Sequence, residues 1–132
     1  MIPINSLIDI DSAIYYMKEM DWADYKELYE IDYDLGPKLF PFMMDGAGNF
    51  HWVDLNNGME NYGKVYWTNT FGESPTYLYN SLTDFFKAIL QAYKTNVITI
   101  DPEGHLDCDY KTWGEICYKL DSTNKYWQEY AN

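Results

Sequence analysis

Apolar positions recur at helical spacing in the segment SLTDFFKAILQAYK, residues 81–94. Their order follows the i, i+3, i+4, i+7 pattern of a helix that presents one face to a core. Ser81 is a suitable N-cap, and Asp84 three residues later suits the positive end of the helix. The pattern predicts a helix that packs on a sheet, with four largely buried side chains: Phe85, Phe86, Ile89 and Leu90.

Short apolar runs separated by turn sequences occupy the middle of the chain. The sequences DGAGN at residues 45–49 and NNG at residues 56–58 are rich in residues that tolerate turn conformations. Short runs between tight turns favour strands that pair with their neighbours in an antiparallel meander. The predicted strands are residues 39–43, 50–55, 64–69 and 76–79.

Helices are predicted at both ends of this sheet. The first begins at Asp11 or Ser12 and extends to about Tyr29, either as one helix or as two helices broken near Met20–Asp21. Asp109 is expected to cap a last helix near the C-terminus.

This order of elements predicts the α+β class, with a mostly antiparallel central sheet of about four to six strands and flanking helices. The chain has no internal repeat and no linker rich in proline, glycine or serine. Its length is typical of one domain. We therefore expect residues 1–132 to form a single domain.

The charge balance is strongly acidic, with 21 acidic residues against nine lysines, no arginine and a net charge of −12. A surface that binds nucleic acid needs basic side chains to neutralise phosphates, so binding to DNA or RNA is not expected. Complementary charge steers association, and the expected partner is a basic protein. The alternative is that the acidity serves only solubility.

The sequence also indicates a compartment. The first residues contain no basic region followed by an apolar stretch, so we expect no signal peptide. No segment approaches about 18 consecutive apolar residues, so we expect no membrane span. The two cysteines, Cys108 and Cys117, are too few for a disulfide framework and are expected to stay reduced. Together these features predict a cytoplasmic protein.

Candidate catalytic groups form no recognisable pattern. His51 lies in a predicted strand and is interpreted as a packed side chain, whereas His105 falls in a turn and is expected to be solvated. Cys108 stands between two aspartates, whose charges raise the pKa of a thiol and disfavour an activated nucleophile. The carboxylate pairs do not fit an EF-hand loop. A Ca²⁺ site of another kind at Asp101–Asp109 is kept as an alternative. We expect no catalytic residue, metal or cofactor, and no enzymatic activity.

Aromatic residues make up 19% of the chain and include 14 tyrosines and five tryptophans. A core of this size cannot enclose all of them. Tyrosine and tryptophan are enriched at binding hot spots because they combine a large apolar area with a polar group. The excess favours a protein-binding module, with the alternative that the aromatic residues only cover a small core.

Short motifs follow one another in a fixed order through the middle of the chain. They are Phe40-Pro41-Phe42, Asp45-Gly46-Ala47-Gly48-Asn49, Asp54-Leu55, Gly63-Lys64-Val65-Tyr66, and Ser81 with Phe85 and Ile89. This ordered set resembles the Smi/Knr-type domain of the SUKH superfamily, whose pattern is an apolar strand, an Asp-Gly-x-Gly-Asn/Asp turn, an aromatic strand ending in Asp-Leu, a Gly-x-Val-Tyr strand and a helix. The resemblance covers residues 36–127 well and residues 1–35 loosely.

The resemblance implies a difference at the N-terminus. Family members usually begin with a helical block that MIPINSLIDIDSAIYYMKEM, residues 1–20, does not match, so we expect a shortened domain with part of its sheet uncovered. Uncovered apolar surface favours a homodimer. The alternative is that residues 1–30 fill the gap and leave a monomer. Candidates for the covering surface are Tyr15, Tyr16, Trp22 and Tyr25.

The family implies a function by binding. Its bacterial members look like immunity proteins, which are non-catalytic and block a cognate toxin domain, often a nuclease. Nucleases have basic grooves, so an acidic partner has the right sign of charge. The alternative, implied by the fungal relatives, is an intracellular scaffold or regulatory module without a toxin partner. The expected contacts, chosen for their placement in predicted loops, are Asp32, Asp34, Asp54, Glu60, Tyr62 and Glu73.

Overall fold

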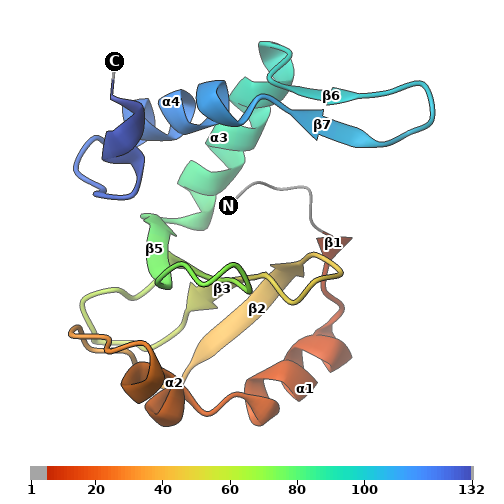
Figure 1. Ribbon diagram of the computed structural model, residues 1–132. Helices are drawn as coiled ribbons and strands as arrows, with labels where there is room; N and C mark the ends of the chain where they lie inside the picture. Colours follow the sequence, from red (N-terminus) through yellow and green to blue (C-terminus); the bar gives the residue numbers. More distant parts are fainter. Residues whose placement is uncertain (1–5, 132) are drawn as a thin grey trace.

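Five strands form one antiparallel sheet in the computed structural model, which describes residues 6–131 (Figure 1). Strands that are neighbours along the chain are also neighbours in the sheet. The four predicted strands are confirmed, whereas β1 is too short to have given a sequence signal. The strands are β1 (Ser6–Leu7), β2 (Leu39–Met44), β3 (Phe50–Asp54), β4 (Val65–Thr68) and β5 (Thr76–Tyr79).

The hairpin between β2 and β3 has the turn that its sequence predicts. The Asp45 carboxylate accepts hydrogen bonds from the backbone N–H of Ala47 at 2.8 Å and of Asn49 at 3.0 Å. Gly48 has a φ of +90°, a conformation that glycine adopts without steric cost. The buried Asn49 side chain accepts a further bond from the Thr70 N–H at 2.7 Å, which links this hairpin to the loop after β4.

Two helices separate β1 from β2, so the broken alternative predicted near Met20–Asp21 is confirmed. The predicted cap of the first helix, Asp11 or Ser12, is wrong by two or three residues. Asp9 is the N-cap, and its carboxylate accepts a hydrogen bond from the Ser12 N–H at 2.8 Å. The helices are α1 (Ile10–Glu19) and α2 (Trp22–Leu28).

The C-terminal part adds helices and a small hairpin. Ser81 accepts a hydrogen bond from the Asp84 N–H at 3.0 Å, and Asp109 accepts one from the Thr112 N–H at 3.3 Å, so both predicted caps are confirmed. No helix within residues 6–131 is long and apolar enough to span a bilayer. The elements are α3 (Leu82–Lys94), β6 (Ile98–Ile100), β7 (Leu106–Cys108), α4 (Tyr110–Leu120) and the 3-10 helix η1 (Trp127–Tyr130).

The sheet lies between two helical layers, because its strands alternate between two buried faces. Along β4, Tyr66 belongs to one buried cluster, and its neighbours Val65 and Trp67 belong to the other. On the first face, Trp22 of α2 meets Trp52 of β3 with ring centroids 4.9 Å apart. The second face is covered by α3, α4 and η1, and Figure 1 shows the two groups of helices on opposite sides of the sheet.

The prediction that Phe86 and Leu90 are buried is wrong. Phe86 is 51% exposed and Leu90 is 54% exposed, whereas Phe85 is fully buried. The buried stripe of α3 consists of Phe85, Ala88 and Ala92. Small side chains allow close approach between packed elements, and α3 packs here against α4 and β6. The wide apolar face of α3 is therefore only partly covered.

The two edges of the sheet end differently, with a two-residue strand at one edge and side-chain donors from the C-terminal part at the other. At one edge, the short strand β1 pairs with β2. At the other edge, the Trp127 indole N–H donates to the Leu78 carbonyl at 2.7 Å, and the Asn124 amide donates to the Tyr77 carbonyl at 2.8 Å. A very short edge strand, and an edge strand whose carbonyls accept bonds from the same chain, both disfavour pairing with other chains.

The N-terminal helices occupy the sheet face that was expected to be uncovered. Tyr16 packs against Phe50 with ring centroids 5.0 Å apart, and Trp22 is only 5% exposed. Trp22 is therefore part of this chain's own core and is not available to cover a second copy. The homodimer itself stays a prediction, which light scattering at two salt concentrations tests.

Gly36 is required by close packing. A Cβ at this position would lie 2.3 Å from both the Cγ and the Oδ1 of Asn56. The buried Asn56 side chain accepts a hydrogen bond from the Lys38 N–H at 2.9 Å. We predict that Gly36→Ala lowers the free energy of unfolding by about 1–3 kcal/mol, because the amide must move and leave buried polar groups unpaired.

The matched control is Gly46→Ala. No atom lies within 4 Å of a Cβ at Gly46, and its φ is not positive. The expected change is within about 0.5 kcal/mol. Chemical denaturation measures both variants, and equal losses of stability would contradict the packing argument for Gly36.

Candidate functional site

Carboxylates cluster on α2 and the segment that follows it. Residues 21–34 include six acidic residues and a single lysine, Lys26. All six acidic side chains are exposed. We call this surface the acidic face, and its members are Asp21, Asp24, Glu27, Glu30, Asp32 and Asp34.

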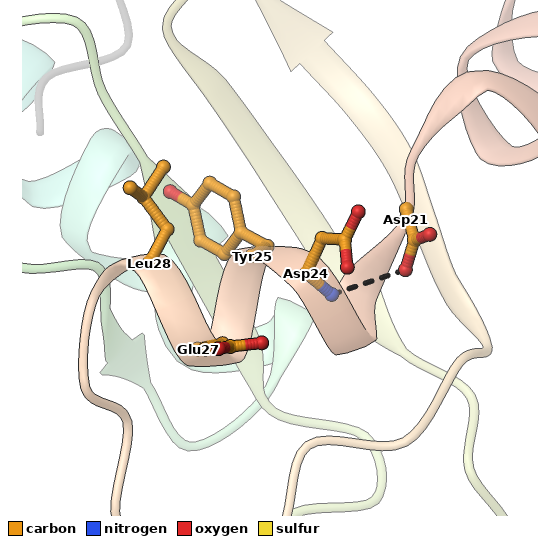
Figure 2. A pocket seen from close by; sticks show the side chains of 5 residues that line it. All are labelled: Asp21, Asp24, Tyr25, Glu27 and Leu28. Atoms are coloured by element: carbon orange, nitrogen blue, oxygen red, sulfur yellow. Dashed lines mark hydrogen bonds between the residues drawn. The ribbon is translucent and has the colours of Figure 1, made fainter.

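An open hollow beside α2 adds apolar groups to the acidic face (Figure 2). The hollow has a volume of about 690 Å³ and is lined by Asp21, Asp24, Tyr25, Glu27 and Leu28. Leu28 is 76% exposed, and Figure 2 shows its side chain beside the Tyr25 ring, with Asp24 and Asp21 farther along the helix. Apolar and tyrosine side chains among carboxylates suit a protein partner that offers both basic and apolar groups.

Helical spacing explains this arrangement. Asp21 is the N-cap of α2 and accepts a hydrogen bond from the Asp24 N–H at 3.1 Å. Asp24 and Glu27 are three residues apart, so they are neighbours on the helix surface. After α2, Glu30 adopts a left-handed conformation with a φ of +51°, and the chain turns back toward the sheet.

A pair of tyrosine hydroxyls fixes the end of the acidic face to the sheet. Tyr33 lies between Asp32 and Asp34, and its hydroxyl is 2.7 Å from the Tyr66 hydroxyl. The Tyr33 hydroxyl also donates to the Pro75 carbonyl at 3.2 Å. Burial raises the pKa of both phenols, so both remain protonated at neutral pH. The two exposed carboxylates thus flank an anchored side chain.

The expectation that Asp54 is an exposed contact is wrong. Asp54 ends β3 and is only 2% exposed. One of its carboxylate oxygens accepts from the backbone N–H and the side-chain amide of Asn56, at 2.9 and 2.8 Å, and the other accepts from the Tyr77 hydroxyl at 2.7 Å. Burial, and then the hydrogen bond to this carboxylate, raises the pKa of Tyr77. Asp54 therefore connects β3, the loop after it and β5.

The remaining predicted contacts are all exposed. Glu60 and Tyr62 lie in the loop between β3 and β4, and Tyr62 is 54% exposed. Glu73 lies in the loop between β4 and β5, beside Tyr126, whose pKa is raised first by burial and then by Glu73. Asp32 and Asp34 belong to the acidic face. The role of all five residues as contacts stays a prediction.

Sequence reasoning missed the part of the acidic face that lies on α2. Contacts were expected in loops, whereas Asp21 and Asp24 lie at the start of a helix and Glu27 near its end. A usable signal was present, because these acids follow one another at intervals of three residues. The buried Trp22 next to Asp21 indicates which side of the helix faces inward.

The two histidines have the structural settings that were predicted. His51 is fully buried on β3, where it packs among the aromatic rings of Phe42, Tyr79 and Phe85. His105 is exposed in the turn between β6 and β7. The prediction of one packed and one solvated histidine is therefore confirmed.

Asp101, Glu103 and His105 are the only three potential metal ligands that lie together within residues 6–131. Their ligand atoms lie within 4.8 Å of one another, and all three side chains are exposed. One Asp101 oxygen accepts from the backbone N–H of Glu103 at 2.9 Å and of His105 at 2.8 Å. This hydrogen-bonded turn accounts for their proximity.

Both cysteine thiols are expected to be unreactive in the folded protein. Burial first, and then Asp109 and Asp107, raises the pKa of the Cys108 thiol to about 11, and burial raises that of Cys117 to about 12. At about pH 8, roughly one thiol in a thousand or fewer is then ionised. We predict that reaction with a disulfide reagent is at least about 100-fold slower in the folded chain than in denaturant. Equal rates would contradict this prediction.

A comparison with known families identifies the class of protein. A model of the SMI1 / KNR4 family (SUKH-1) matches residues 1–88. No curated protein matches the chain. Because the family match covers more than half of the 132 residues, the chain belongs to the SMI1/KNR4 family. This family is generally non-catalytic.

The matched range differs from the expected one. It includes residues 1–35, where only a loose resemblance was expected, and it ends within α3. It therefore contains both N-terminal helices, the whole five-stranded sheet and the acidic face. The hairpin β6–β7, α4 and η1 lie outside it.

Proposed function

We propose that the chain is a non-catalytic immunity protein that binds a basic toxin domain in the cytoplasm and blocks its activity. The observation on which the proposal depends is the acidic face. Three of its six exposed carboxylates, those of Asp21, Asp24 and Glu27, line one hollow with the exposed Leu28 and the half-buried Tyr25. Membership of the SMI1/KNR4 family supports a binding role without catalysis. The exposed loop residues Glu60, Tyr62 and Glu73 are proposed as further contacts.

A nuclease is the toxin class whose chemistry fits this face best. A groove that binds nucleic acid is lined by lysine and arginine side chains, which neutralise the phosphates. Carboxylates arranged along α2 and the segment after it present the same sign of charge as a nucleic-acid backbone. Leu28 and Tyr25 add the apolar and aromatic anchors that supply much of the binding energy in protein interfaces.

Inhibition of a purified toxin domain tests the proposal. The toxin domain to use is one encoded beside the gene for this chain, assayed for nuclease activity with increasing amounts of the chain. We expect loss of activity as the two proteins reach equal concentrations. Binding without inhibition favours the alternative of a scaffold or regulatory module, and the absence of binding would contradict the proposal.

Association with the toxin domain should depend strongly on salt. Raising the salt concentration from about 50 mM to about 500 mM shortens the Debye length from about 13 Å to about 4 Å. Because steering by complementary charge acts on the encounter step, we predict a fall of about tenfold or more in the association rate constant. Surface-based kinetic measurements follow both rate constants. An association rate that is independent of salt would contradict the electrostatic part of the proposal.

A further inference from the structure

The other helical layer contains a surface of opposite character. A hollow of about 410 Å³ lies between α3 and α4. Three lysines line it from both helices, and three apolar side chains lie among them. We call this surface the lysine groove, and these residues are Lys87, Lys94, Lys119, Leu90, Ile116 and Leu120.

Three of the nine lysines of this chain, whose net charge is −12, lie together in the groove, and no carboxylate lines the hollow with them. The salt bridges found within residues 6–131 involve only His105. Lys87, Lys94 and Lys119, like the other lysines within residues 6–131, therefore have no ion-pair partner there and are free to meet carboxylates of a partner.

The apolar part of the groove continues onto the open side of α3. Phe86, Leu90 and Tyr93 are 51%, 54% and 42% exposed, and their spacing of four and three residues forms a stripe along the helix. Leu120 of α4 is 42% exposed on the other wall of the groove. A continuous apolar surface bordered by one sign of charge is typical of an interaction site.

We propose that the lysine groove binds an acidic amphipathic helical segment of a partner protein. Apolar side chains of such a segment would fill the hollow around Leu90 and Leu120, as in other helix-in-groove interactions. Lys87 and Lys94 are two helical turns apart, about 10.5 Å along α3, so carboxylates spaced seven residues apart on a parallel segment align with them. This proposal is independent of the toxin-binding role of the acidic face.

Two observations favour a helical segment over an anionic membrane surface. The groove is a concave space between two helices, which suits inserted side chains better than a flat bilayer. The net charge of −12 also repels an extended anionic surface, whereas a single segment lies within a Debye length of the three lysines.

A displayed library of amphipathic helical peptides tests the proposal with the full-length chain. The library contains acidic and basic members with the same apolar spacing, and selected peptides are then measured by fluorescence anisotropy. We expect acidic members to be enriched. Leu90→Glu, and Lys87→Glu combined with Lys94→Glu, should each weaken their binding by about tenfold or more.

Matched variants distinguish groove binding from general effects. Leu28→Glu changes an exposed leucine on the acidic face, and Lys18→Glu changes an exposed lysine on α1, so both should leave peptide binding unchanged. Thermal melting confirms that each variant is folded. Enrichment of basic peptides, no enrichment, or binding that survives Leu90→Glu would overturn the proposal. Groove-dependent binding to phosphatidylserine vesicles without peptide binding would also overturn it.

Discussion

Replacement of Asp24 and Glu27 together by lysine is expected to weaken binding to the toxin domain by about 100-fold. Both residues are exposed on α2 and line the hollow beside Leu28. Close charge pairs across an interface contribute at least about 1.5 kcal/mol each, and every 1.4 kcal/mol is about tenfold in affinity. Isothermal titration calorimetry measures the dissociation constants of the wild-type chain and the variant.

The control for this variant reverses two acids far from α2. Glu103 and Asp107 are exposed on the β6–β7 hairpin, which extends away from the rest of the molecule in Figure 1. Glu103→Lys combined with Asp107→Lys makes the same change in net charge without altering the acidic face. We expect its affinity to stay within about threefold of the wild type. Equal weakening by the two double variants would show that net charge alone, and not the acidic face, governs binding.

Phe85→Ala should lower the free energy of unfolding by about 3–5 kcal/mol, the range typical of a fully buried aromatic side chain. The Phe85 ring is enclosed on the second face of the sheet, with ring centroids 4.9 Å from Tyr79 and 5.5 Å from Phe42. Its removal leaves a cavity where α3 meets the sheet. Chemical denaturation monitored by tryptophan fluorescence measures the change.

Phe86→Ala is the neighbouring control on the same helix. Phe86 is about half exposed, so the expected loss is about 1 kcal/mol. Both variants replace phenylalanine by alanine within α3, so the change in helix propensity is the same. The two variants differ in how deeply the removed ring was buried. A loss for Phe86→Ala as large as that for Phe85→Ala would mean that the buried face of α3 has been assigned wrongly.

Local sequence signals predicted most of the fold. The turn at residues 45–49, the N-caps Ser81 and Asp109 and the four longer strands all depend on interactions between residues close in sequence. The strand β1 escaped prediction because two residues carry no periodicity, and only its pairing with β2 defines it.

The side of a helix that becomes buried depends on its neighbours. The apolar residues of α3 form a face that is wider than the area its neighbours cover. The helical spacing alone therefore predicted burial for Phe86 and Leu90 as well. The structure covers only the stripe through Ala88 and Ala92, because α4 and β6 pack against that side. The remaining apolar surface became visible only in the structure.

The candidate site could be predicted in part. The acid excess and the tyrosine content indicated a basic protein partner, and Asp32 and Asp34 are exposed as expected. Asp54 was wrongly predicted to be exposed, because a charged residue at the end of a strand, next to a turn, is usually solvated. Its burial depends on donors that the fold brings in from Asn56 and Tyr77.

Protection of living cells is the most direct test of the central claim that the acidic face neutralises a toxin. Cells that express the toxin domain used in the inhibition assay would be grown with the wild-type chain, with the Asp24→Lys, Glu27→Lys variant or with the Glu103→Lys, Asp107→Lys control. We predict growth with the wild type and the control, and death with the acidic-face variant. Death with the wild-type chain, or equal survival with all three, would contradict the claim.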